Sequence, residues 1–137
     1  MAAIKSQTTV SGDVLADPNY WDDYEGKGPR LTLMLLYAPR HWDETEGRWQ
    51  QSDSGQTRIK LQYSGNAARR VHLLFDRGVL RIGLPVHAHG RVSDTPCVRK
   101  YRGRLETSHL VYAEDLDVDL VTLATRDPQL TGFTAVA

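Results

Sequence analysis

The stretch that decides the fold is TRIKLQYSGNAARRVHLLFDRG, residues 57–78, in which one periodicity replaces another. From Thr57 to Tyr63, apolar and polar side chains alternate, which is typical of a strand with one buried face. From Ser64 onward the apolar side chains recur at helical spacing, and Ser64 or Asn66 can cap the start of a helix. The sequence therefore predicts a strand that leads directly into a helix.

Further strand-like segments lie on both sides of this unit. Upstream, residues 8–15 and 30–40 are rich in Thr, Val and Leu. Downstream, residues 85–92 and 104–118 are predicted as strands, and residues 93–103 connect them with turn signals at both ends. The order is three strands, one helix and two strands. This is the order of the OB-fold, an all-β, five-stranded Greek-key barrel with its helix between strands three and four.

Length and composition set limits on the class of protein. A chain of 137 residues fits one domain, and we expect an OB-fold domain over residues 1–120 and a short tail over residues 121–137. The longest apolar run, residues 31–38, is too short to span a bilayer, and the first residues do not read as a signal peptide. Cys97 is the only cysteine, which excludes an internal disulfide and a multi-cysteine zinc site. We therefore expect a cytoplasmic protein.

The neutral net charge conceals a basic segment. Residues 58–104 carry 11 Lys and Arg against two acids, a surplus of nine positive charges, and the rest of the chain carries an equal surplus of acids. A segregated basic segment can attract a polyanion even when the total charge is zero. The alternative is that strands and a helix present solvated charged faces.

The peptide VRKYRGR, residues 98–104, is the densest part of this segment. Four cations surround one aromatic ring there: Arg99, Lys100, Arg102 and Arg104 flank Tyr101. Binding of a single nucleic-acid strand needs both, because rings stack on bases and cations meet phosphates. A hairpin on the open face of the barrel would present both groups, and a solvated hairpin is the alternative.

Four stretches together resemble a known family over about residues 8–118. They are VSGDVLADP (10–18), RHWDETEGRW (40–49), RIKLQYSGNAARRV (58–71) and LRIGLPVHAHGRV (80–92). Their order and spacing are similar to those of the bacterial single-stranded DNA-binding proteins. The resemblance implies non-catalytic binding of single-stranded DNA with little sequence preference, in replication, recombination and repair. It also implies a homo-oligomer, a tetramer or dimer, assembled through the first strand.

The resemblance also suggests which residues bind the strand. Trp42 and Tyr63 lie where the family has stacking aromatics, although Trp42 can instead pack on the barrel rim or at a subunit contact. Tyr63 shares a strand face with Ile59 and Leu61, so a core position is equally open. The polar residues Arg58 and Lys60, with Arg91 on the fourth strand, either line a basic groove or are solvated.

Other aromatic residues are given structural roles. We interpret Trp49 as a residue that pins a β-arm. Trp21, Tyr20 and Tyr24 lie among acids that would repel phosphate, so we interpret them as packing or interface residues.

The sequence departs from the family in places. Thr57 stands where a second aromatic is usual, and the chain shows no acidic, Phe-tipped tail of the kind that docks replication proteins. These departures leave two alternatives open: an OB-fold paralogue that serves protein interactions, and an RNA-binding OB-fold protein.

An enzyme or metal protein has little support in the sequence. His87 and His89 lie on one face of a strand and could bind zinc if a third ligand joined them. No third ligand is evident, and no nucleophile or phosphate-loop motif is present. We therefore expect no catalytic residue, no metal and no cofactor.

Overall fold

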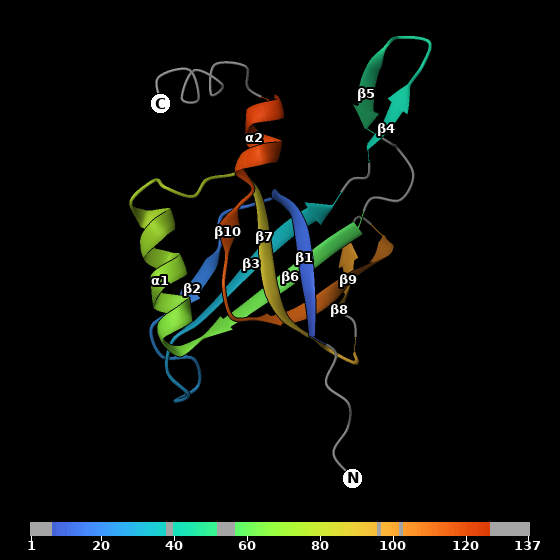
Figure 1. Ribbon diagram of the computed structural model, residues 1–137. Coiled ribbons are helices and arrows are strands. Elements are labelled where there is room, and N and C mark those ends of the chain that lie inside the picture. Colours follow the sequence, from blue (N-terminus) through green and yellow to red (C-terminus); the bar gives the residue numbers. More distant parts are fainter. Residues whose placement is uncertain (1–6, 38–39, 52–56, 96, 102, 127–137) are drawn as a thin grey trace, which may run out of the picture.

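The computed structural model describes residues 7–37, 40–51, 57–95, 97–101 and 103–126. These residues form β-strands and two helices, arranged as a barrel with one helix at its side (Figure 1). In chain order the elements are β1 Gln7–Val14, β2 Asn19–Trp21, β3 Arg30–Tyr37, β4 Arg40–Asp43, β5 Arg48–Gln51, β6 Thr57–Ser64, α1 Gly65–Asp76, β7 Pro85–Val92, β8 Cys97–Tyr101, β9 Arg104–Ala113, β10 Asp117–Val118 and α2 Leu120–Arg126.

Five of these strands form a closed barrel. Neighbouring strands follow the order β7, β1, β3, β6, β9, and a further pairing of β7 with β9 closes the circle. The pairs are antiparallel except for β6 with β9, which run parallel. Helix α1 connects β6 to β7, that is, the third barrel strand to the fourth. The predicted OB-fold is therefore confirmed.

The alternation in the deciding stretch is realised as an inward and an outward face of β6. Ile59, Leu61 and Tyr63 point into the core, and Leu31, Leu33 and Leu35 of β3 do the same. Each such side chain contributes about 1.5–3 kcal/mol when it is fully buried. The other face of β6 remains polar, so this strand contributes Ile59, Leu61 and Tyr63 to the core and presents cations outward.

Closure of the barrel depends on Gly90. This residue of β7 lies opposite Thr8 of β1 on one side and Ala113 of β9 on the other. A Cβ atom at this position would meet the carbonyl oxygen of Tyr112 and would lie 2.8 Å from the Cα of Ala113. The two strands approach this closely only because glycine has no side chain.

The last predicted strand is divided in the structure. The segment expected over residues 104–118 forms β9, a bend and the short strand β10, which pairs with β7. Residues 93–103 contribute β8, which forms a hairpin with β9. The bend after Ala113 lets the chain follow β7 along its second edge.

Helix α2 was not predicted from the sequence. Asp119 precedes it, and its carboxylate accepts hydrogen bonds from the Thr122 backbone N–H at 3.0 Å and hydroxyl at 2.7 Å. At the other end, Arg126 forms an ion pair with Asp13 of β1, with an N–O distance of 2.7 Å. Residues 120–126 therefore contact the barrel, whereas residues 127–137 of the predicted tail lie outside the described residues. Neither of the two helices in the described part of the chain is long and apolar enough to cross a membrane.

Candidate nucleic-acid interface

A groove of about 730 Å³ runs over the outer faces of β3 and β6. Its floor includes Met34 of β3 with Arg58 and Lys60 of β6, the polar face that the alternation predicts. Its sides include Trp21 of β2 and Val98 of β8. We call this the β3–β6 groove. It brings two cations, an indole ring and apolar side chains to one concave surface.

Trp21 is the residue of this groove that sequence reasoning missed. Its side chain is 39% exposed, and its ring meets Tyr24 edge-on at 5.3 Å between centroids. Tyr24 in turn lies under the Arg30 guanidinium, 3.9 Å from the ring centroid. The neighbouring acids concealed this role. The available signal was its position in the connection between the first two barrel strands, since that loop contacts oligonucleotides in OB-folds.

The strand that carries Trp21 is anchored to helix α1. The Tyr20 ring stacks on the His72 imidazole, with centroids 4.0 Å apart and ring planes 6° from parallel. Loss of hydration raises the pKa of Tyr20, and the nearby Asp22 raises it further while Arg69 opposes the change. Since successive side chains of a strand point to opposite sides, the Tyr20 contact turns Trp21 toward the groove.

Tyr63 belongs to the core and not to the interface. Its side chain is 0% exposed, and its hydroxyl donates a hydrogen bond of 2.7 Å to the Asp115 carbonyl oxygen. Burial raises the pKa of Tyr63, and the charges of Asp115 and Asp117 raise it further. No face of the ring is available to a base. Of the two interpretations that the sequence left open, the structure supports the core position.

The β8–β9 hairpin borders the groove. Val98 of β8 and Ser108 of β9 line it, and Lys100, two residues after Val98, is exposed on the same face of β8. The predicted roles of the other hairpin residues stay predictions. The side chains of Arg99, Tyr101 and Arg104, and the whole of Arg102, lie outside the described residues.

The predicted β-arm is present as a separate two-stranded sheet. Strands β4 and β5 pair so that Trp42 lies opposite Trp49 along the backbone. The side chains of both residues lie outside the described part. Stacking by Trp42 and a pinning role for Trp49 therefore stay predictions.

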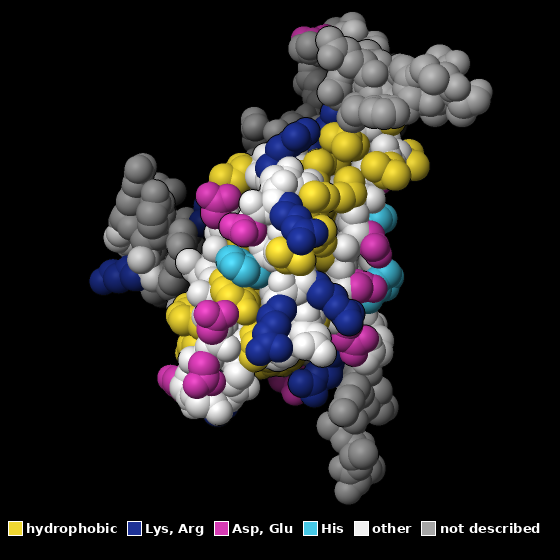
Figure 2. Space-filling view, turned by 90° about the vertical axis from the view of Figure 1, so that its left-hand side faces the viewer, with side chains coloured by type: hydrophobic (Ala, Val, Ile, Leu, Met, Phe, Trp, Pro, Cys, Tyr) yellow, Lys and Arg dark blue, Asp and Glu magenta, His cyan; other side chains and the backbone are white. Residues whose placement is uncertain are grey.

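The described cations of the basic segment lie at several places on the molecule. Arg58 and Lys60 line the groove, and Arg91 lies in a different hollow. Figure 2 shows a face on which Lys and Arg side chains run down the middle, with acids at both sides. Exposed arginines of α1 and the loop after it are Arg69, Arg70, Arg77 and Arg81. Figure 1 shows α1 on the opposite side of the barrel from the β8–β9 hairpin.

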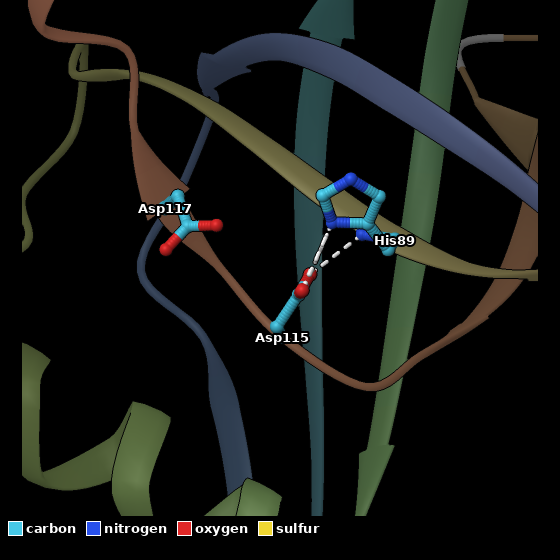
Figure 3. A group of neighbouring side chains, drawn as sticks. All are labelled: His89, Asp115 and Asp117. Atoms are coloured by element: carbon cyan, nitrogen blue, oxygen red, sulfur yellow. Dashed lines mark hydrogen bonds and ion pairs between the residues drawn. The ribbon is translucent and has the colours of Figure 1, made fainter.

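One group of side chains could hold a metal ion. His89, Asp115 and Asp117 each offer a ligand atom, and these atoms lie within 4.8 Å of one another (Figure 3). The His89 Nδ1 atom lies 2.9 and 3.1 Å from the two Asp115 carboxylate oxygens. This group differs from the His87–His89 pair considered from the sequence, because the bend after β9 brings Asp115 and Asp117 beside His89 of β7. His87 is not part of this group, and the expectation that the protein binds no metal stays a prediction.

The barrel order, the placement of α1 and the groove over the second and third barrel strands define an OB-fold protein. Among solved structures, the chain is similar to a small single-stranded DNA-binding protein from Streptomyces coelicolor, with a TM-score of 0.66 and 21% identity over 86% of this chain and 97% of the other. It is also similar to a Plasmodium falciparum single-stranded DNA-binding protein in complex with single-stranded DNA, with a TM-score of 0.52 and 14% identity over 86% and 97% of the two chains.

A single-stranded DNA-binding protein from Thermus aquaticus gives a TM-score of 0.52 and 20% identity, over 84% of this chain and 50% of the other. At these identities the likeness concerns the fold, and at that level it confirms the resemblance inferred from the sequence. No family model matches the sequence. No curated protein matches it either.

Proposed function

We propose that the chain binds single-stranded DNA in the β3–β6 groove, without catalysis and with little sequence preference. The observation that carries the proposal is the placement of Arg58 and Lys60 on the floor of a groove that Trp21 borders. Cations on the floor can follow phosphates, and an exposed indole can stack on a base, which contributes about 1–3 kcal/mol per base. Asp17 also lines the groove and would repel a phosphate near it.

The fold supports this proposal. The three solved structures named above are those of single-stranded DNA-binding proteins, and one of them contains single-stranded DNA. A role in replication, recombination or repair is the biological setting that fits such binding, in a homo-oligomer of two or four chains.

The experiment that tests the proposal measures binding of labelled oligo(dT), duplex DNA and RNA at two salt concentrations. We expect oligo(dT) to bind more tightly than duplex DNA, and its affinity to fall with salt because phosphate contacts release counterions. No binding of oligo(dT) by micromolar protein at low salt would refute the proposal. Tighter binding of RNA than of oligo(dT) would favour the RNA-binding alternative.

A protein-interaction module is the second candidate, and one observation favours it. Beside the arginines of α1, Leu73, Val79 and Ile82 are between 43% and 57% exposed. Exposed aliphatic side chains next to cations suit an acidic, amphipathic protein segment. If no nucleic acid binds, this surface becomes the candidate binding site for a protein partner.

A further inference from the structure

A second hollow follows the β3–β6 groove along the outer face of β6. Arg58 and Lys60 of this strand line the groove, and Gln62 and Ser64 line the hollow, which has a volume of about 490 Å³. Alternate residues of a strand lie on one face, about 7 Å apart. The groove and the hollow therefore follow one another along a single strand.

Tyr112 places an aromatic ring in this hollow. Strands β6 and β9 run parallel, with Leu110 beside Lys60 and Tyr112 beside Gln62. Since Val111 of β9 points into the core, Tyr112 points outward, and it is 36% exposed. The ring thus lies beside Gln62, the next residue after Lys60 on the outer face of β6. We call this site the Tyr112 hollow.

Arg91 brings a cation to the same ring. It lies opposite Tyr112 in the pairing of β7 with β9, and its guanidinium carbon is 5.1 Å from the Tyr112 ring centroid. An aromatic ring beside a guanidinium can contact a base and a neighbouring phosphate together. Among the described residues that line the hollow, Glu114 is the one acid, and it would repel a phosphate there.

We propose that the Tyr112 hollow is a second binding station for the single strand. A strand that occupies the β3–β6 groove continues along β6 and places a base on Tyr112, with a phosphate near Arg91. The inference rests on the proposed function and extends it, because affinity then rises with length until the oligonucleotide covers both the groove and the hollow.

The test compares a short and a long fluorescein-labelled oligo(dT), of about 5 and about 15 nucleotides, within the range of about 4–16 nucleotides that one OB-fold covers. The decisive quantity is the ratio of the long to the short affinity, which a partial loss of folded protein leaves unchanged. We expect Tyr112→Ala to lower this ratio about tenfold. Tyr112→Leu should lower the ratio by the same factor, because leucine keeps an apolar side chain at this position but has no aromatic ring to stack on a base.

Two further variants complete the design. Tyr37→Ala is the matched control, since Tyr37 is an exposed tyrosine that lines neither the groove nor the hollow. Glu114→Gln should raise the ratio about twofold or more by removing a repulsive charge, a gain that misfolding cannot produce.

The outcomes separate the two proposals. If the parent binds neither oligonucleotide, the proposed function fails. If the parent binds both and the Tyr112 variants keep its ratio, the second station is wrong while binding in the groove stands.

Discussion

At the scale of single residues, the groove contains an aromatic ring, Trp21, and a cation, Lys60, whose contributions to DNA binding can be measured separately. Trp21→Ala should weaken oligo(dT) binding by about 1–3 kcal/mol through lost stacking, and should leave the dependence on salt unchanged. Lys60→Ala should instead flatten the plot of log affinity against log salt by about one unit or less, because one phosphate contact is lost. Salt titrations of both variants by fluorescence anisotropy measure the two effects.

A matched control for these variants is Lys27→Ala. Lys27 is an exposed cation of the β2–β3 connection that does not line the groove. If Lys27→Ala flattens the salt dependence as much as Lys60→Ala does, the protein attracts DNA by its general charge and the groove has no special role.

The buried Tyr63 allows a prediction about stability alone. Tyr63→Phe removes the hydroxyl that donates to the Asp115 carbonyl and leaves the ring in the core. We expect the free energy of unfolding to fall by about 1 kcal/mol, the usual contribution of one hydrogen bond. Urea unfolding measures this loss. Oligonucleotide binding should be unchanged, and a large loss of binding would return Tyr63 to the interface.

At the scale of elements, α2 depends on its cap at Asp119. Hydrogen bonds from the Thr122 hydroxyl and backbone N–H lower the pKa of the Asp119 carboxyl below its ordinary value of 3.8. A carboxylate whose pKa is lowered in the folded state stabilises the protein above its unfolded pKa, and this contribution is lost as pH falls through the folded value.

Asp119→Ala should therefore lower the free energy of unfolding by about 1 kcal/mol at neutral pH, as expected for loss of an N-cap. The difference between variant and parent should shrink as the pH falls below 3.8. Urea unfolding at pH 7 and in acid measures both values. A difference that stays constant down to the lowest pH would show that the carboxylate charge does not stabilise α2.

The elements also show which parts of the structure could be predicted from the sequence. Alternation in residues 57–63 and helical spacing after them predict β6 and α1, because each pattern reports which side of one element meets the core. Trp21 and the His89–Asp115 pair were not predicted, since both depend on which strands lie side by side after folding. The acids around Trp21 indicated repulsion of phosphate, whereas the fold turns its ring toward Arg58 and Lys60.

At the scale of the whole molecule, the neutral net charge reflects separate charged surfaces. The groove, the Tyr112 hollow and the face of α1 each carry arginine or lysine, and the acids lie mainly on other parts of the chain. A single strand in the groove therefore meets only some of the cations. This arrangement leaves the α1 face for other contacts, such as those of the protein-interaction alternative.

The first strand gives the whole molecule an edge that another chain can cover. β1 pairs with β7 from Gln7 to Asp13, but it pairs with β3 only at Asp13 and Val14. Within the described residues, the stretch from Gln7 to Ser11 thus keeps one edge without a strand partner. Exposed edges are sites at which chains add to one another, and stable proteins usually cover them.

We therefore expect a homo-oligomer that assembles through β1. Light scattering should give a mass of two or four times 15.4 kDa at working concentration. Because a lysine on an edge strand opposes pairing with a second chain, Thr9→Lys should shift the mass toward that of one chain, whereas Thr125→Lys on α2 serves as a matched control. A single-chain mass for the parent protein, or no response to Thr9→Lys, would show that the β1 edge does not assemble the protein.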